Sequence, residues 1–177
     1  NPAGTRAYVL NYGDGTVSVI DTVAQATVGA PISVGYFPLG VAVTPDGTRA
    51  YVAVYGPDVS VAVINTTTNA VAATIPASEF AALGTAGPIG VAFNATGTRA
   101  YIANYNSNSL AVVDSDRTSG AYNTVVDNIA LDVSYAIPRN VVVVGDQLYV
   151  STQDPNDSTL VVQVVDIDET GPGYGTI

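Results

Sequence analysis

Hydrophobic residues along the chain fall in short runs that are separated by turn residues. The runs Val41–Val43 and Val141–Val144 are almost continuously apolar, which is typical of strands that are buried on both faces. A turn such as Thr44–Gly47 follows, with Pro45 at its second position and Gly47 at its fourth, as in type I turns. No window keeps a sustained helical period. The pattern predicts an all-β chain of short antiparallel strands.

The same motifs return three or four times along the sequence, in a constant order. The tyrosines that anchor the first motif, Tyr8, Tyr51, Tyr101 and Tyr149, are 43, 50 and 48 residues apart. The first motif occurs at Gly4–Val9, Gly47–Val52, Gly97–Ile102 and, in degenerate form, Gly145–Val150. A second occurs at Pro38–Val43, Pro88–Phe93 and, more loosely, Pro138–Val143. A third occurs at Val17–Asp21, Val61–Asn65, Leu110–Asp114 and Val162–Asp166.

Each repeat has room for four short strands, and a period of this length with four strands is the pattern of a β-propeller blade. We therefore predict a single domain over residues 1–177, with blades at about 2–34, 38–76, 88–133 and 138–177. Small Ala and Gly residues should let neighbouring sheets approach near the axis, and the interfaces between blades should supply most of the hydrophobic stabilisation.

The predicted blades do not fill a complete set of strands. The chain opens at the turn before a second strand, and a fourth strand of blade 4 is expected within Gly171–Ile177, which makes about fifteen strands. A four-bladed ring is possible, but part of a larger ring is preferred; a seven-bladed ring would need roughly 300 residues at this period. An unclosed half-ring would expose strand edges and an apolar blade face.

The composition excludes several kinds of chemistry. The chain has 15 acidic residues against 5 basic ones, all of them Arg, and a net charge of −10, so a nucleic-acid-binding surface is not expected. Cys and His are absent, which removes thiol nucleophiles, Ser-His-Asp triads and the usual zinc or haem ligands. No apolar run approaches the roughly eighteen residues of a membrane span. We assign no catalytic residue, cofactor or metal ligand.

The repeated motifs resemble the YVTN-type β-propeller repeat of archaeal and bacterial surface-layer and cell-surface proteins. The resemblance covers residues 2 to about 166, and the tetrapeptide itself is only approximated, for example by Tyr8–Asn11 and Tyr101–Asn104. The fourth repeat departs furthest, because it lacks the Thr-Arg-Ala of the others. The resemblance implies a propeller, commonly seven-bladed, that serves as a structural or interaction module, and it implies no particular ligand.

Two groups of charged residues invite a functional interpretation, but a structural one is favoured for both. Three arginines share one repeat position, and pairing with the Asp or Asn that ends the third strand is preferred over a ring of cations around an anion; the pairs would be Arg6 with Asp21, Arg49 with Asn65 and Arg99 with Asp114. The C-terminal carboxylates could offer oxygen ligands to calcium, but they lack the spacing of a calcium loop and are expected to be solvated turn residues; they are Asp154, Asp157, Asp166, Asp168 and Glu169.

A candidate binding site lies where the repeats differ in length. The connection Pro76–Gly87 is an insertion compared with the short Ser33–Phe37 of the preceding blade, and loops on a rigid scaffold often carry function. This kind of connection lies on the propeller face where ligands usually bind. We therefore predict a possible binding lip formed by Tyr36, Phe37, Glu79 and Phe80, with a neutral lengthening of the loop as the alternative.

Two functions from different classes remain open at this stage. The leading hypothesis is a non-enzymatic, extracytoplasmic or cell-surface module for scaffolding, adhesion or protein binding, whose partner is a protein or another component of the cell envelope. Self-association, or completion of the ring by further segments, is also possible. The alternative is a lactonase-like propeller hydrolase, which would need a general base from Asp, Glu, Arg or Tyr in the central channel. Fold alone cannot decide between them.

Overall fold

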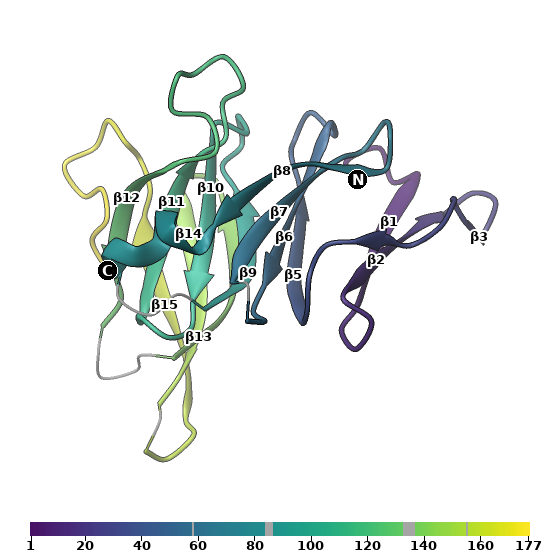
Figure 1. The fold of residues 1–177 in the computed structure, drawn as a ribbon. Helices are drawn as coiled ribbons and strands as arrows, with labels where there is room; N and C mark the ends of the chain where they lie inside the picture. Colours follow the sequence, from purple (N-terminus) through teal and green to yellow (C-terminus); the bar gives the residue numbers. More distant parts are fainter. Residues whose placement is uncertain (58, 84–86, 133–136, 155) are drawn as a thin grey trace.

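A computed structural model describes residues 1–57, 59–83, 87–132, 137–154 and 156–177, and it consists of four antiparallel sheets in chain order (Figure 1). Blade 1 contains β1 (Arg6–Asn11), β2 (Thr16–Asp21), β3 (Ala26–Thr27) and β4 (Ile32–Ser33). Blade 2 contains β5 (Pro38–Val43), β6 (Arg49–Val54), β7 (Ser60–Asn65) and β8 (Ala70–Pro76). Blade 3 contains β9 (Pro88–Phe93), β10 (Arg99–Asn104), β11 (Ser109–Asp114) and β12 (Val125–Ala130). Blade 4 contains β13 (Ile137–Val144), β14 (Gln147–Gln153) and β15 (Leu160–Asp166).

In blades 2, 3 and 4 the strands pair in the order in which they occur, so the apolar runs become the inner strands. The runs predicted from Val41–Val43 and Val141–Val144 form parts of β5 and β13. The first strands β5, β9 and β13 of successive blades lie against one another, as expected around a common axis. This arrangement confirms the predicted all-β propeller fold.

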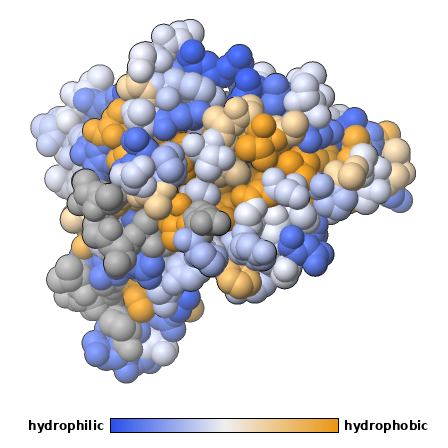
Figure 2. Space-filling model, in the orientation of Figure 1, coloured by the Kyte–Doolittle hydropathy of each residue, from blue (hydrophilic) through white to orange (hydrophobic). Residues whose placement is uncertain are grey.

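The core consists of three seams, one between each pair of neighbouring blades. In the seam between blades 2 and 3, the buried side chains of Tyr51 and Val63 from one sheet meet those of Ile102 and Val113 from the other. Equivalent clusters fill the seams between blades 1 and 2 and between blades 3 and 4. Hydrophobic residues form a band across the middle of the molecule in Figure 2, with hydrophilic residues gathered over loops above and below it.

Glycine lets the inner strands approach closely, as the sequence predicts. A Cβ atom on Gly40 of β5 would overlap the carbonyl oxygen of Ile89 in β9 and would lie 3.0 Å from the Cα atom of Gly90. Side chains of any size are therefore excluded at this point near the axis.

The outward faces of the two end blades carry the residue types that fill the seams elsewhere. Val9 of β1 is 46% exposed, whereas Val52 and Ile102 at the same repeat position are fully buried. Val162 of β15 is 60% exposed, whereas Val61 at its repeat position is fully buried. The described residues of the two end blades thus include exposed apolar side chains, as the sequence analysis expects for the blade face of an unclosed ring.

The described residues form fifteen strands, which agrees with the predicted number, but the strands at the two ends of the chain differ from the expected set. β3 and β4 both pair with β2 and are two pieces of one outer strand. The described part of blade 4 has three strands, and Gly171–Ile177 forms turns instead of the expected fourth strand. Asp166 nevertheless exchanges backbone hydrogen bonds with Gly175 and Thr176, as Asp114 does with Asn123 and Thr124 just before β12. Gly175 and Thr176 of blade 4 therefore correspond to Asn123 and Thr124 of blade 3, the two residues directly before β12.

Candidate functional site

The two ends of the blades form two different faces. β1 of blade 1 carries the same motif as β6 and β10, so it holds the position of a second strand and β2 that of a third. The turns between first and second strands and the loops between third and fourth strands share one end of the blades. Because this end contains Arg6, Arg49, Arg99 and Arg117, we call it the arginine face. The turns between second and third strands and the connections between blades share the other end, which we call the tyrosine face. The loop between β11 and β12 and the hairpin between β14 and β15 mark these two ends at the top and bottom of Figure 1.

On the arginine face, the repeated arginines take part in pairing within their own blades. Arg6 forms an ion pair with Asp21 at 2.6 Å, and Arg99 forms one with Asp114 at 3.4 Å. Arg49 stands opposite Asn65 in the register, but its guanidinium donates to the carbonyl oxygen of Thr48 at 2.8 Å. The predicted pairing is thus confirmed in blades 1 and 3, and in blade 2 only the strand register matches it.

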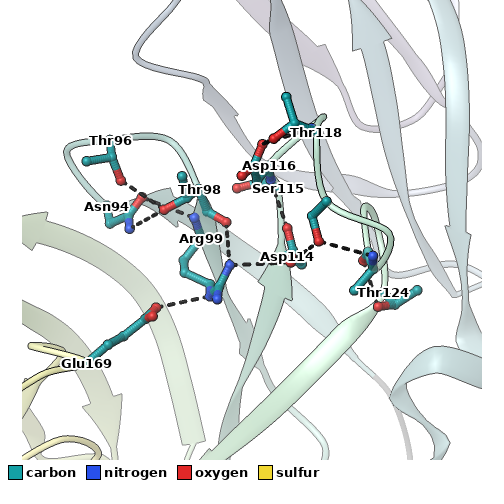
Figure 3. Close-up of polar contacts among 12 residues, drawn as sticks. Asn94, Thr96, Thr98, Arg99, Asp114, Ser115, Asp116, Thr118, Thr124 and Glu169 are labelled. Atoms are coloured by element: carbon teal, nitrogen blue, oxygen red, sulfur yellow. Dashed lines mark hydrogen bonds and ion pairs between the residues drawn. The ribbon is translucent and has the colours of Figure 1, made fainter.

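Arg99 also links two blades (Figure 3). Its Nε atom lies 3.0 Å from the Glu169 Oε1 atom, which comes from the loop that follows β15 of blade 4. Tyr174 of the same loop packs against the seam between blades 3 and 4, and burial, followed by nearby carboxylates, raises its pKa to about 12. These contacts attach the last loop to blade 3, so we interpret the cluster in Figure 3 as structural.

Several carboxylates on both faces cap turns. The Oδ1 atoms of Asp154 and Asp157 accept backbone hydrogen bonds from Asn156 at 2.7 Å and Thr159 at 2.8 Å. Asp168 accepts from the backbone of Thr170 at 2.9 Å, and hydrogen bonds from that residue lower the pKa of its carboxyl group. These three carboxylates therefore stabilise local turns, in line with the structural interpretation of the sequence. Over the described ranges, no cluster of acidic side chains has the geometry to hold a metal ion.

The insertion after blade 2 has a different role from the predicted lip. It begins as the 3₁₀ helix η1 (Ala77–Leu83), an element that the sequence pattern does not predict. Phe80 is fully buried in the seam between blades 2 and 3, and a carboxylate oxygen of Glu79 accepts a hydrogen bond from the Val125 backbone at 3.3 Å. Phe80 in this position cannot contact a ligand, because the insertion folds back to close the outer side of the seam. The prediction for Phe80 is corrected accordingly; residues 84–86 lie outside the described part.

Tyr36 and Phe37, the other half of the predicted lip, lie on the tyrosine face. Tyr36 is 62% exposed, and its ring lies 6.3 Å from that of Phe37. Phe37 stacks on Tyr12 with 4.8 Å between ring centroids. Its φ of 58° lies in the left-handed region, which bulky residues rarely occupy. Backbone strain of this kind is often found at functional sites, and here it presents an aromatic ring to solvent.

Next to this pair is a groove that crosses the seams between all four blades. The tyrosine groove is lined by Tyr12, Leu39, Tyr55, Ile89, Tyr105 and Arg139. Tyr55 and Tyr105 directly follow β6 and β10, the second strands of their blades, and Tyr12 directly follows β1, which carries the same repeat motif. The other three residues lie at the second or third position of β5, β9 and β13. Repetition of the blade therefore places one tyrosine at each seam. The rings of Tyr55 and Tyr105 meet edge to face at 5.9 Å between centroids.

Arg139 ends the groove at blade 4 and is the one cation in its lining. Its guanidinium lies 5.2 Å from the centroid of the Tyr105 ring, a cation–π arrangement. Its Nε atom donates to Gln153 Oε1 at 3.1 Å, and its Nη2 atom donates to the same oxygen. Among the described residues, no carboxylate lies within ion-pair distance of Arg139, in contrast to Arg6 and Arg99. Gln153 therefore holds the guanidinium of Arg139 in one orientation.

Sequence reasoning did not single out the groove residues as a site, although part of the signal was visible. Tyr12, Tyr55 and Tyr105 each stand four positions after the anchoring tyrosine of their repeat. Arg139 stands where the second motif has Leu39 and Ile89, so it is the residue that breaks the repeat. An aromatic residue kept in three repeats beside one position that changes character is a pattern that could have indicated the groove.

Comparison with known proteins supports the fold without assigning a family. No family model and no curated protein matches the sequence. Hydrazine synthase of Kuenenia stuttgartiensis is similar in structure, with a TM-score of 0.79 and 25% identity over 94% of this chain and 44% of that chain. U3-55K is similar with a TM-score of 0.69 and 10% identity, over 93% of this chain and 51% of that one. The dihydro-heme d1 dehydrogenase NirN has a TM-score of 0.63 and 17% identity, over 98% of this chain and 38% of that one.

These solved proteins include two enzymes, but the chain spans only about half, or less, of their lengths. Their activities therefore belong to them and are not transferred to this chain by the likeness. Among the described residues, no helix is long and apolar enough to cross a membrane. The comparisons and the topology together show that this chain has a β-propeller fold.

Proposed function

We propose that this chain is a non-catalytic protein-binding module whose contact surface is the tyrosine groove, together with Tyr36 and Phe37. The observation that supports this most directly is the row of partly exposed rings beside the exposed Arg139. Tyrosine and arginine are enriched at the energetic centres of protein interfaces, where acidic residues and lysine are depleted. Two χ angles fix a tyrosine ring, so little conformational entropy is lost when a partner covers it.

The rigid position of the groove favours binding without rearrangement of the backbone. The backbone amides of Tyr55 and Tyr105 donate to the carbonyl oxygens of Phe37 and Gly87, at 3.1 and 2.7 Å. The tyrosines are thus held by the same connections that join one blade to the next. A site built on strand ends and tied to neighbouring blades needs little ordering on binding.

The sequence resemblance to YVTN-type repeats leads us to propose that the module works outside the cytoplasm, at the cell surface, in adhesion or scaffolding. The lactonase-like alternative requires a general base in the site. No carboxylate is found among the residues described as lining the tyrosine groove. The groove is thus better suited to binding than to hydrolysis.

The proposal can be tested by capture from an envelope extract of the source cells, with the immobilised chain as bait. Three baits are compared: the unmodified chain, the double variant Tyr12→Ala with Arg139→Gln, and Arg117→Gln. The last is the matched control, because it removes an arginine from the opposite face. We expect a partner that the unmodified chain and Arg117→Gln retain equally and that the double variant loses.

Capture that does not differ between the three baits would refute binding through the groove, and so would the absence of any captured protein. Thermal unfolding of each bait, followed by circular dichroism, checks that the variants are folded. Tyr12 is 55% exposed and Arg139 is also exposed, so their replacement should leave the fold intact.

A further inference from the structure

We propose that the occupant of the tyrosine groove is an extended, proline-containing peptide segment with a carboxylate that pairs with Arg139. This inference rests on the proposed function and specifies the partner's chemistry. It follows from three properties of the described groove residues: the paired backbone at Tyr55 and Tyr105, the aromatic and aliphatic side chains of the lining, and its one cation, Arg139.

The backbone at Tyr55 and Tyr105 is already paired. Their amides are hydrogen-bonded to the carbonyl oxygens of Phe37 and Gly87, and the strands that precede them, β6 and β10, are each paired on both sides. Recognition by strand addition to a sheet edge is therefore not available at these two tyrosines. A ligand that covers their rings is recognised there through side chains, and its own backbone stays hydrogen-bonded to water.

The lining fits a polyproline II segment. Such a segment has no internal hydrogen bonds, keeps its backbone solvated, and docks in grooves lined by aromatic side chains. Tyr12, Tyr55 and Tyr105 provide the rings, and Leu39 and Ile89 lie between them. Prolyl rings can pack on both kinds of surface, and the segment loses little entropy because it is stiff before it binds.

A sugar chain fits the same lining less well. Its many hydroxyl groups would be placed against Leu39, which is 43% exposed, and against the edges of the rings. Polar groups that lose water without gaining hydrogen bonds disfavour binding. The hydrogen-bonding groups of the lining are limited to the tyrosine hydroxyls and Arg139.

Arg139 sets the charge of the partner at one end of the groove. Gln153 holds its Nε and Nη2 atoms, and the Tyr105 ring lies at 5.2 Å from its guanidinium carbon. A guanidinium in a fixed orientation, with N–H groups still free to donate, suits a carboxylate through charge-assisted hydrogen bonds. A cationic partner would meet like charge at this position.

The experiment uses four synthetic nonapeptides as probes: Pro-Pro-Glu, Pro-Pro-Gln, Pro-Pro-Lys and Gly-Ser-Glu, each repeated three times. In the polyproline II conformation a nonapeptide is about 28 Å long. Binding is measured by titration into the ¹⁵N-labelled chain, so that shifts of individual amides locate the contact. We expect the Pro-Pro-Glu peptide to shift the amides of Tyr12, Tyr55 and Tyr105, and to bind at least about tenfold more tightly than the other three.

Variants then test the named contacts. Arg139→Gln should weaken the binding of the Pro-Pro-Glu peptide by about tenfold and make its affinity equal to that of the Pro-Pro-Gln peptide. Arg117→Gln should change neither affinity. Tyr12→Ala should weaken the binding of both the Pro-Pro-Glu and the Pro-Pro-Gln peptide by about fivefold. Equal affinities of the Pro-Pro-Glu, Pro-Pro-Gln and Pro-Pro-Lys peptides would overturn the proposal that a carboxylate pairs with Arg139. An equal affinity of the Gly-Ser-Glu peptide and the Pro-Pro-Glu peptide would overturn the proposal that the segment binds in the polyproline II conformation.

A further arm separates failure of this inference from failure of the proposed function. Tetragalacturonic acid, an acidic oligosaccharide, is titrated in the same way, and shifts at the groove with this probe alone would overturn the peptide class. If no peptide shifts the groove amides but groove-dependent capture of a protein persists, the segment chemistry is wrong and the protein-binding function stands. If both fail, the proposed function falls with the inference.

Discussion

Replacing Phe80 with Ala tests whether the insertion after blade 2 belongs to the core. The Phe80 side chain is fully buried in the cluster that also contains Tyr51, Val61 and Ile102, between blades 2 and 3. A buried aromatic side chain removes about 150–250 Å² from water, and at about 25 cal/mol per Å² this contributes roughly 4–6 kcal/mol. Because Ala keeps part of this area, the expected loss in the free energy of unfolding is about 3–5 kcal/mol.

The assay is equilibrium unfolding in urea, followed by circular dichroism. Phe37→Ala is the matched control, because this phenylalanine is 36% exposed on the tyrosine face and should cost no more than about 1 kcal/mol. The midpoint should fall for Phe80→Ala at an unchanged slope, as expected when stability changes but the surface exposed on unfolding does not. Phe80→Leu should lose only about 1–2 kcal/mol, which keeps the test informative if the alanine variant does not fold.

Equal and small effects of Phe80→Ala and Phe37→Ala would refute the reasoning. They would mean that η1 can leave the seam at little cost, and the original interpretation of this segment as an exposed lip would then be restored. A large loss for Phe80 alone would place the insertion in the cooperative core.

Three further predictions concern the seams. In a double-mutant cycle, Arg99→Gln and Glu169→Gln should show a coupling free energy of about 0.5–1 kcal/mol. A coupling of zero would mean that the ion pair between blades 3 and 4 does not contribute to stability. Gly40→Ala should lower the free energy of unfolding by about 2 kcal/mol, because the added methyl group overlaps the neighbouring blade. Gly120→Ala is the control and should change it by less than about 0.5 kcal/mol, because a Cβ atom there would meet no atom within 4 Å. Similar effects of the two substitutions would contradict the close approach of β5 and β9. Because burial raises the Tyr174 pKa to about 12 from 10.0, its contribution to stability is complete below pH 10 and is lost as the pH rises to 12, so Tyr174→Phe should reduce the loss of stability over this range. An ultraviolet titration of the folded protein should lose one tyrosine ionisation near pH 12 in the same variant, and a loss near pH 10 instead would contradict the burial.

The candidate site was only partly predictable from the sequence. The difference in length between connections drew attention to Tyr36 and Phe37, which do lie on an exposed aromatic surface, but also to Glu79 and Phe80, which do not. An amphipathic insertion can point its aromatic residue outwards or back into a seam, and its sequence looks the same in both cases. The structure resolves this because the outer side of the seam between blades 2 and 3 is open to a side chain of that size.

The repeat, the four blades and the pairing of Arg6 and Arg99 with Asp21 and Asp114 could be predicted from the sequence, because apolar runs, turn residues and motif spacing are local properties that each blade carries within its own 40 to 50 residues. Pairing within a blade follows from the hairpin. The contacts between residues of different blades became visible only in the folded chain. Tyr105 and Arg139 are 34 positions apart and Arg99 and Glu169 are 70 apart, and they come together because blades pack around an axis, a relation that no local pattern encodes.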